Sequence, residues 1–157
     1  MVIPQVGASE EKGVPAIDVK ALKRALVDAG LEVFRVRGEE VHLAERQNVQ
    51  LMEAGVRVRG GEAPAVTVVA RAQRNDAPEL SPETLLDLVR ARLAPLYTDG
   101  YVEVDAVTRE IRSVSDKSQV TDIWSEVTLR RDVASLEEAV AVACHAVTTD
   151  RYVVPRR

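Results

Sequence analysis

Cysteine is almost absent from this sequence. Cys144 is the only one among 157 residues, which excludes a disulfide within the chain and a zinc site with several thiolate ligands. A thiolate and imidazole pair at Cys144 and His145 is disfavoured as well, because neighbouring residues of a helix point about 100° apart. We therefore expect a packed cysteine beside a surface histidine.

Aromatic residues are also few: the chain has one phenylalanine, one tryptophan and three tyrosines. Its core must therefore consist mainly of valine, leucine and alanine. The composition, 46% hydrophobic and 29% charged, is still that of a globular chain. A chain of 157 residues buries roughly two-thirds of its unfolded surface around one core. We expect a flexible arm at residues 1–16, where glycine and proline recur, and a single domain at residues 17–157.

An excess of positive charge and a long apolar run are missing too. The formal net charge is −4, with both signs mixed along the chain, so nonspecific binding to nucleic acid or to an anionic membrane is disfavoured. No apolar run is long enough to span a bilayer, and residues 1–5 lack the basic start of a secretory signal. We expect a cytoplasmic protein with neither nucleic-acid nor membrane partners.

Motifs with a definite chemistry are absent. Neither His42, in an expected strand, nor His145 has a recognisable carboxylate partner, so a metal site is poorly supported. Gly60 and Gly61 do not fit a phosphate-binding loop, which needs more glycines at fixed offsets. The acidic residues are scattered, without a pair suited to acid and base roles. We predict a non-enzymatic protein without metal or cofactor; an enzyme that uses one of the histidines is the alternative.

Helix signals, by contrast, are clear at both ends of the chain. Apolar residues at helical spacing predict a helix over residues 19–29, with Asp18 as its N-cap and Gly30 just past its end. Near the C-terminus, Ser135 and Glu138 form the capping box of another helix. The buried stripe of this last helix is expected at Leu136, Ala139, Val140, Ala143 and Val147.

A middle helix is predicted from Ser81 onward. Ser81 is its N-cap, and Pro82 takes the first helical position, where no backbone N–H is needed. Pro95 is expected to end it. Its apolar stripe is wide and consists of Leu85, Leu86, Leu88, Val89 and Leu93.

Strand signals fill the stretch between the first two helices. Alternating apolar residues predict a hairpin over residues 34–43 and a third strand over residues 49–58, after a turn at residues 45–48. A bulge is expected at Gly55. Residues 65–72 are almost continuously apolar, which is typical of a central strand covered on both faces or nearly so.

Further β segments follow the middle helix, at residues 101–106, 110–114 and 121–131. The first two are either separate strands or one long strand with a bulge at Thr108-Arg109. Trp124 lies in the last segment. We interpret it as a core residue, with a binding contact as the alternative.

Basic residues repeat along the early strands. Arg35 and Arg37 share one face of a strand, and so do Arg57 and Arg59, so together they can form a band on the solvent side of the sheet. Such a band suits an anion or an acidic peptide. Cross-strand ion pairs with the many nearby glutamates are the commoner explanation.

Three stretches of sequence fix the order of the elements. They are Val19-Lys20-Ala21-Leu22-Lys23-Arg24-Ala25-Leu26 with Leu31-Glu32-Val33, the Ser81-Pro82 helix with Tyr101-Val102-Glu103-Val104, and Ala134-Ser135-Leu136-Glu137-Glu138-Ala139-Val140. Over residues 17–154 this order resembles the type III secretion chaperone-like fold, and in particular the YbjN-like bacterial proteins. It departs from their pattern by an extra turn near Asn48.

The resemblance implies an α+β fold with an antiparallel sheet, in the order α-β-β-β(-β)-α-β-β(-β)-α. It also implies a small acidic homodimer without catalysis, in which a partner segment docks on sheet and helix surfaces. By position, the dimer or partner contacts fall on Leu86, Val89, Arg90, Leu93, Ile123 and Trp124.

We therefore predict a non-enzymatic protein-binding or chaperone-like module, which acts as a homodimer and binds another protein or an extended peptide. The alternative is a small-ligand-binding or sensory domain. It would recognise an anionic molecule through Arg35, Arg37, Arg57 and Arg59.

Overall fold

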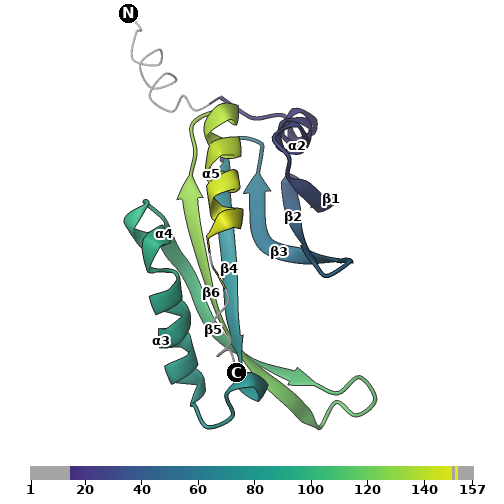
Figure 1. Cartoon of the computed structure of the whole chain (residues 1–157), viewed down its shortest axis with the longest axis vertical. Helices are drawn as coiled ribbons and strands as arrows, with labels where there is room; N and C mark the ends of the chain where they lie inside the picture. Colours follow the sequence, from purple (N-terminus) through teal and green to yellow (C-terminus); the bar gives the residue numbers. More distant parts are fainter. Residues whose placement is uncertain (1–14, 150, 152–157) are drawn as a thin grey trace, which may run out of the picture.

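The computed structural model describes residues 15–149 and residue 151. The arm expected at residues 1–16 lies outside this part of the chain, apart from Pro15 and Ala16. The described residues form four α-helices and six strands, and the strands make one antiparallel sheet (Figure 1). The predicted α+β class with an antiparallel sheet is confirmed.

Four strands precede the middle helix and two follow it. In chain order the elements are α2 (Val19–Asp28), β1 (Glu32–Arg37), β2 (Glu40–Gln47), β3 (Gln50–Arg59), β4 (Ala65–Gln73), a 3₁₀ turn (Arg74–Asp76), α3 (Pro82–Arg92), α4 (Ala94–Thr98), β5 (Val102–Arg112), β6 (Val120–Asp132) and α5 (Leu136–Thr148). The strand order across the sheet is β1-β2-β3-β4-β6-β5. Consequently β4 is central, as predicted, and β1 and β5 are the edge strands.

Side-chain caps fix where three helices begin. Asp18, Ser81 and Ser135 each accept a hydrogen bond from the backbone N–H three residues later, at 3.0, 3.1 and 3.0 Å. These bonds satisfy N–H groups that have no partner within the helix. The capping box of α5 is displaced by one residue, because the carboxylate of Glu138 accepts from the N–H of Ala134 at 2.6 Å.

The helices cover a single face of the sheet, which we call the helix face. α2 packs on β1 and β2, α5 on β3 and β4, and α3 on β4 and β6 (Figure 1). Ser125 of β6 is fully buried there and donates to the carbonyl oxygen of Pro82 at 2.9 Å, which ties α3 to the sheet. The buried strand residues of the helix face include Val41, Val56, Val58, Val66, Val68, Ala70, Val127 and Leu129.

The opposite face, which we call the open face, carries no helix from the described part of the chain. Its residues alternate with those of the helix face and include Thr67, Val69, Arg71, Trp124, Glu126, Thr128 and Arg130. Thr67 and Val69 are half-exposed and Arg71 is exposed. The expectation that residues 65–72 are covered on both faces is therefore wrong, since one face alone is packed under helices.

A fork opens inside the sheet where β3 leaves β4. In the described residues β3 pairs with β4 only over Val56–Arg59, while its outer half stays paired with β2 and bends away (Figure 1). The predicted bulge at Gly55 is present at this point, with φ of 79°. A Cβ on Gly55 would lie 2.6 Å from the carbonyl oxygen of Val69. Glycine is therefore needed where the two strands part.

Two loop predictions need correction. The turn between β2 and β3 is Asn48-Val49 rather than residues 45–48, because the ladder continues to the pair of Gln47 with Gln50. Asn48 adopts φ of 61°, which a short polar side chain tolerates. Of the two alternatives for the segments at residues 101–106 and 110–114, the single long strand is present, as β5 (Val102–Arg112), but its irregularities lie after Glu103 and Ile111 rather than at Thr108-Arg109.

The helix stripes also differ in detail. α3 ends at Arg92, and Pro95 is not its stop but an early residue of α4, where its missing N–H costs no hydrogen bond. In α5 the buried residues include Val142 and Ala146, whereas Val140 and Val147 only pack against the rim of the core. Ala139 and Ala143 are buried as predicted, so the two stripes overlap and differ at their margins.

Candidate functional site

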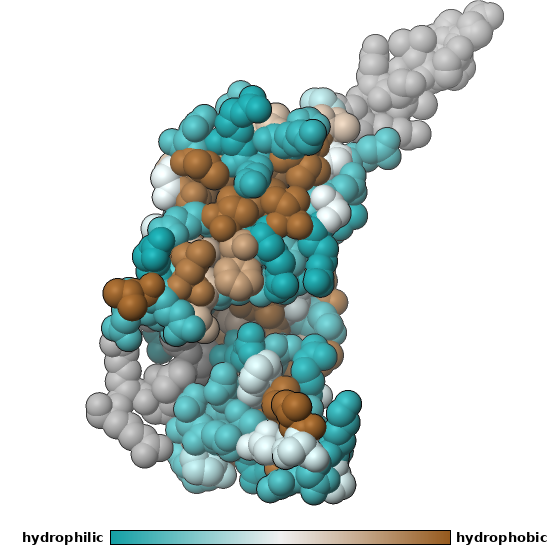
Figure 2. Space-filling view, turned by 90° about the vertical axis from the view of Figure 1, so that its right-hand side faces the viewer, coloured by the Kyte–Doolittle hydropathy of each residue, from teal (hydrophilic) through white to brown (hydrophobic). Residues whose placement is uncertain are grey.

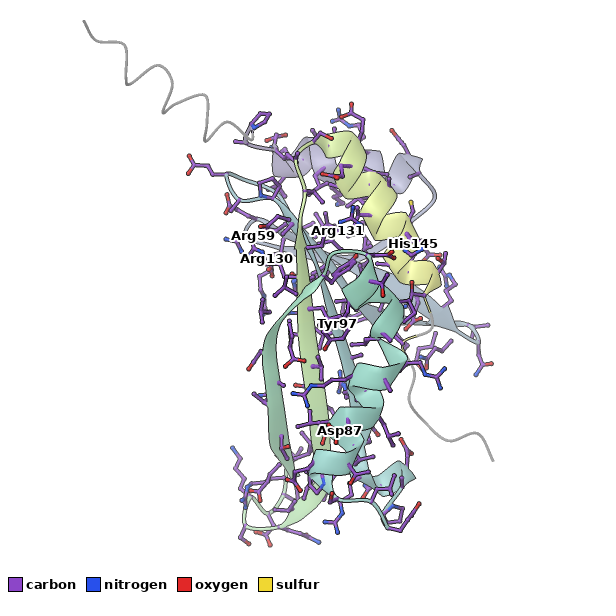
Figure 3. All side chains as sticks on the ribbon, turned by 90° about the vertical axis from the view of Figure 1, so that its left-hand side faces the viewer. Arg59, Asp87, Tyr97, Arg130, Arg131 and His145 are labelled. Atoms are coloured by element: carbon purple, nitrogen blue, oxygen red, sulfur yellow. The ribbon has the colours of Figure 1, made fainter. Side chains whose placement is uncertain are left out.

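Arginines follow neighbouring strands on the open face. Arg35 of β1 pairs with His42 of β2, which pairs with Arg57 of β3. Because directly opposed residues share a face, these three side chains stand in one row. Figure 3 shows Arg59 and Arg130 on the side of the strands away from α3 and α5. The structure therefore places Arg35, Arg57 and Arg59 on the solvent side of the sheet, as expected.

Most of this arginine band is neutralised by glutamates. Arg35 and Arg57 both contact the carboxylate of Glu53, at 2.9 and 3.2 Å. Arg59 lies 3.4 Å from Glu39 and 3.7 Å from Glu40. The cross-strand ion pairs that were expected as the commoner explanation of these arginines are therefore present.

Arg37 differs from the other three, because the described residues show no ion pair for it. Its position on the edge strand β1 leaves it exposed.

His42 lies inside this charged network and is only 3% exposed. Its Nε2 is 3.2 Å from Glu40, and its Nδ1 is 3.3 Å from both Glu53 Oε1 and the Nε of Arg35. The prediction that His42 lacks carboxylate partners is therefore wrong. Glu40 could have been found from the sequence, because residues two apart in a strand share a face. Glu53 could not, because its register depends on the bulge.

The shared carboxylate of Glu53 shows the strength of the positive charge around it. Partial burial raises the pKa of Glu53, but the charges and hydrogen bonds of Arg57 and Arg35 outweigh that effect, so its pKa lies below the ordinary value of 4.5. The carboxylate therefore stays ionised at neutral pH.

A pocket of about 590 Å³ occupies the fork between β3 and β4; we call it the fork pocket. Gly55 and Val69 mark its inner end, and Thr128 forms part of its floor on the open face. Charged groups dominate the rest of the lining. The guanidinium groups are those of Arg57, Arg71, Arg109 and Arg151, and the carboxylates are those of Glu45, Glu53, Asp76 and Glu126.

Arg151 closes one side of the fork pocket and is only 6% exposed. Its Nη1 donates to the carbonyl oxygen of Ala54, its Nη2 donates to that of Val147 at 3.4 Å, and Glu45 lies 3.7 Å from Nη2. These contacts join the end of α5 to the departing strand β3. Sequence reasoning missed Arg151 because nothing near it in the chain indicates burial.

A second pair of arginines lies on the floor of the pocket. Arg109 and Arg71 both contact the carboxylate of Glu126, at 3.0 and 3.6 Å. The guanidinium of Arg71 also lies 4.0 Å from the ring centroid of Trp124. The indole N–H of Trp124 donates to Asp122 at 2.9 Å. Trp124 is therefore a half-exposed residue of the open face rather than part of the core.

The residues expected at a dimer or partner contact do not form one surface. Val89 and Leu93 are fully buried in the core, and Leu86 packs partly against it. Ile123 alternates with Trp124 along β6, so the two side chains lie on opposite faces of the sheet. Most of the wide apolar stripe of α3 therefore lies in the core.

Arg90, the remaining member of that set, holds a structural ion pair. Its Nε and Nη2 donate to the two carboxylate oxygens of Glu103 at 3.0 and 3.2 Å, and the hydroxyl of Tyr97 donates to Glu103 at 2.7 Å. Burial, then the bond to Glu103, raises the pKa of Tyr97 to about 12. The hydrogen bonds from Arg90 and Tyr97 lower the pKa of Glu103. This cluster joins α3, α4 and β5 on the helix side, where Figure 3 shows Tyr97.

The second histidine lies at the surface, as expected, but it too has a carboxylate nearby. His145 is exposed on α5, and its Nδ1 lies 3.8 Å from Asp99 (Figure 3). Cys144 is half-buried and carries a free thiol. Although Cys144 and His145 are neighbours in the chain, the described residues show no hydrogen bond between the thiol and the imidazole.

Exposed apolar side chains gather at the β1 end of the molecule. Figure 2 views this end and shows hydrophobic surface concentrated on the half that carries α2 and β1. We call Val27, Phe34 and Val36 the edge patch; all three are exposed. Phe34 is the extra residue of a bulge in β1, and the guanidinium of Arg35 lies 5.3 Å from its ring centroid.

Comparisons with known proteins give no identity. The chain matches no protein-family model, no curated protein and no solved structure. In residues 15–149 and 151, no group of three or more histidine, cysteine, aspartate or glutamate side chains could hold a metal ion. No helix in that part of the chain is long and apolar enough to cross a membrane. Function is therefore inferred from the geometry of the fork and the open face.

Proposed function

We propose that the protein is a non-enzymatic, chaperone-like binding module, which holds an extended segment of a partner protein in the fork between β3 and β4. The fork carries this proposal. Beyond Val68, strand β4 has no partner on its β3 side in the described residues, although it runs on to Gln73. The backbone of these five residues, about 16 Å long and without a partner strand on this side, offers hydrogen-bonding groups to an incoming strand.

The fork pocket supplies the second requirement, which is space for side chains. A strand added to a sheet edge gains affinity from backbone hydrogen bonds and specificity from pockets for alternate side chains. The pocket of about 590 Å³ opens beside the unpaired part of β4. Its size lies in the range of roughly 300–1,000 Å³ usual for ligand pockets.

The order of elements supports the chaperone-like part of the proposal. Apart from the additional short helix α4, the order α-β-β-β-β-α-α-β-β-α is similar to the order that the resemblance to YbjN-like and type III secretion chaperone-like proteins implies. The described histidines support a role without catalysis. His42 is enclosed by charged side chains, and His145 is exposed, with its carboxylate contact at 3.8 Å.

A displayed library of eight-residue peptides tests this function. The parent should enrich segments that bind in an extended conformation. Thr128→Trp, which fills the floor of the fork pocket, should abolish their binding. Thr67→Trp is the matched control, because Thr67 lies on the same open face but does not line the pocket. Enrichment of no peptide, or binding that survives Thr128→Trp, would contradict the proposal.

The homodimer is also a proposal, and we place its contact at the edge patch. Val27, Phe34 and Val36 expose apolar area beside the edge strand β1. Two copies related by a two-fold axis can pair such edges and cover both patches. The surface of α3 offers less, because its largest apolar residues already lie in the core.

A further inference from the structure

Strand β4 changes in composition where it leaves β3. On the helix face Val66 and Val68 are followed by Ala70 and Ala72, so the side chains become smaller just where the ladder with β3 ends. Side chains of neighbouring strands pack side by side on a sheet face, so small residues leave room for larger ones beside them. The fork therefore offers an unpaired backbone edge together with space for the side chains of an added strand.

Arg151 brings the chain's own backbone to this place. Charged side chains are rarely buried unless they are paired, yet Arg151 is only 6% exposed. Its guanidinium group donates to the carbonyl oxygens of Ala54 on β3 and Val147 on α5. It also lines the fork pocket together with Val69 and Ala70 of β4. The chain therefore leaves α5 beside the gap between β3 and β4.

The residues that follow Arg151 suit a strand. They are Tyr152, Val153 and Val154, and tyrosine and valine are enriched in strands. Pro155 comes next and lacks the N–H that a longer ladder would need. Three extended residues span about 10 Å, which fits within the unpaired stretch of β4, about 16 Å long.

The direction of the chain also suits the fork. Helix α5 runs in the same direction as β4 (Figure 1). A chain that continues along α5 is therefore parallel to β4 and antiparallel to the outer half of β3, which pairs with β4 in the antiparallel sense.

We propose that residues 152–154, which lie outside the described part of the chain, form a short strand parallel to β4 in the fork of the free protein. A partner segment then binds by displacing this strand. The displacement rests on the proposed function, whereas the occupancy of the fork by residues 152–154 does not.

Amide hydrogen exchange tests the occupancy, by comparison of the full chain with a chain shortened to end at Arg151. The backbone N–H groups of residues 69–73 that point into the fork should exchange at least tenfold faster in the shortened chain, because they lose their acceptors. The amides of residues 56–59, in the ladder between β3 and β4, are the control and should exchange at an unchanged rate. Equal exchange of residues 69–73 in both chains would overturn the proposal.

A second variant keeps the full length and decides the matter if the shortened chain fails to fold. Val153→Pro with Val154→Pro removes the N–H groups on both edges of the segment, so the same amides of β4 should exchange faster. Arg156→Gln, which lies beyond Pro155, is the matched control and should leave their exchange unchanged. Exchange in the double-proline variant at the rate of the parent would contradict the added strand.

Peptide binding separates this inference from the proposed function. An eight-residue segment selected by the full chain should bind the shortened chain several-fold more tightly, because the fork is then no longer occupied. Equal affinity for both chains would overturn the displacement; with equal exchange as well, the added strand fails and the proposed function stands. Faster exchange in the shortened chain, with no peptide bound by either chain, would support the added strand and contradict the proposed function.

Discussion

The two faces of this sheet are built from the same strands by alternate residues, yet they are held in different ways. On the helix face, aliphatic side chains such as Val66 and Leu129 are closed off by three helices. On the open face, arginine and glutamate side chains such as Arg57 and Glu53 neutralise one another across strands. The first arrangement closes an apolar core, and the second covers a solvent-facing surface with ion pairs.

The largest expected effect contrasts neighbouring residues of β6. Leu129→Ala should lower the free energy of unfolding by about 2–5 kcal/mol, because it empties a fully buried position on the helix face. Thr128→Ala, on the open face, should cost less than about 1 kcal/mol. Urea denaturation measures both. Similar losses from the two variants would show that the open face is packed as tightly as the helix face.

A substitution at the fork should give the next largest loss of stability. Gly55→Ala should destabilise by more than the roughly 1–3 kcal/mol of an unfavourable backbone conformation, because the added Cβ collides with the carbonyl of Val69. Gly38→Ala is the control, since Gly38 also has positive φ but nothing within 4 Å of its Cβ. Thermal unfolding of both variants checks this. Equal losses of stability in Gly55→Ala and Gly38→Ala would argue against a close approach of β3 and β4.

The ion pairs of the open face should give a smaller, pH-dependent effect. Glu53→Gln should cost about 1–3 kcal/mol at neutral pH, because it leaves Arg35 and Arg57 without their shared carboxylate. The folded-state pKa of Glu53 is lowered, so its contribution is present above the unfolded value near 4.5 and is lost as pH falls through the folded pKa.

The difference between parent and Glu53→Gln should therefore shrink in acid. Chemical denaturation between pH 7 and pH 3 measures this difference. The control is Glu62→Gln at an exposed position, which should change the free energy of unfolding by about 0.5 kcal/mol or less. A difference that grows as pH falls would reverse the sign and contradict the stabilising role of Glu53.

The smallest change in stability is expected at the edge patch. Phe34→Glu with Val36→Glu should convert a dimer to a monomer in sedimentation experiments while the free energy of unfolding of the monomer changes little, because both side chains are exposed. Leu88→Glu on α3 should leave the dimer intact. A parent that sediments as a monomer would remove the dimer from the proposal.

Short-range signals made much of the fold predictable. The caps at Asp18, Ser81 and Ser135 act within one helical turn, so the sequence alone locates the helix starts. The hydrophobic run at residues 65–72 likewise indicated the central strand. Each of these features depends on residues close to one another in the chain.

The candidate site was harder to predict from the sequence, because it depends on strand register and on contacts between residues that are far apart in the chain. Glu53 reaches His42 only through the bulge at Gly55, and Arg151 contacts Ala54, which lies far from it in the chain. Trp124 could be placed on either face until its pairing with Gln73 was known. The alternation of apolar residues predicts that a strand is present, but it does not show which residues of the neighbouring strand lie opposite.

The short ladder between β3 and β4 has a mechanical consequence. Within residues 15–149 and 151, four residue pairs, from Val56 to Arg59, make up the strand pairing that joins the three-stranded part β1–β3 to the rest of the sheet. The packing of α5 across β3 and β4, together with Arg151, braces this narrow junction from the side. Arg151 and α5 therefore link the two halves of the sheet beside the fork, so a force on the Arg151 guanidinium group would also act on this junction of four residue pairs.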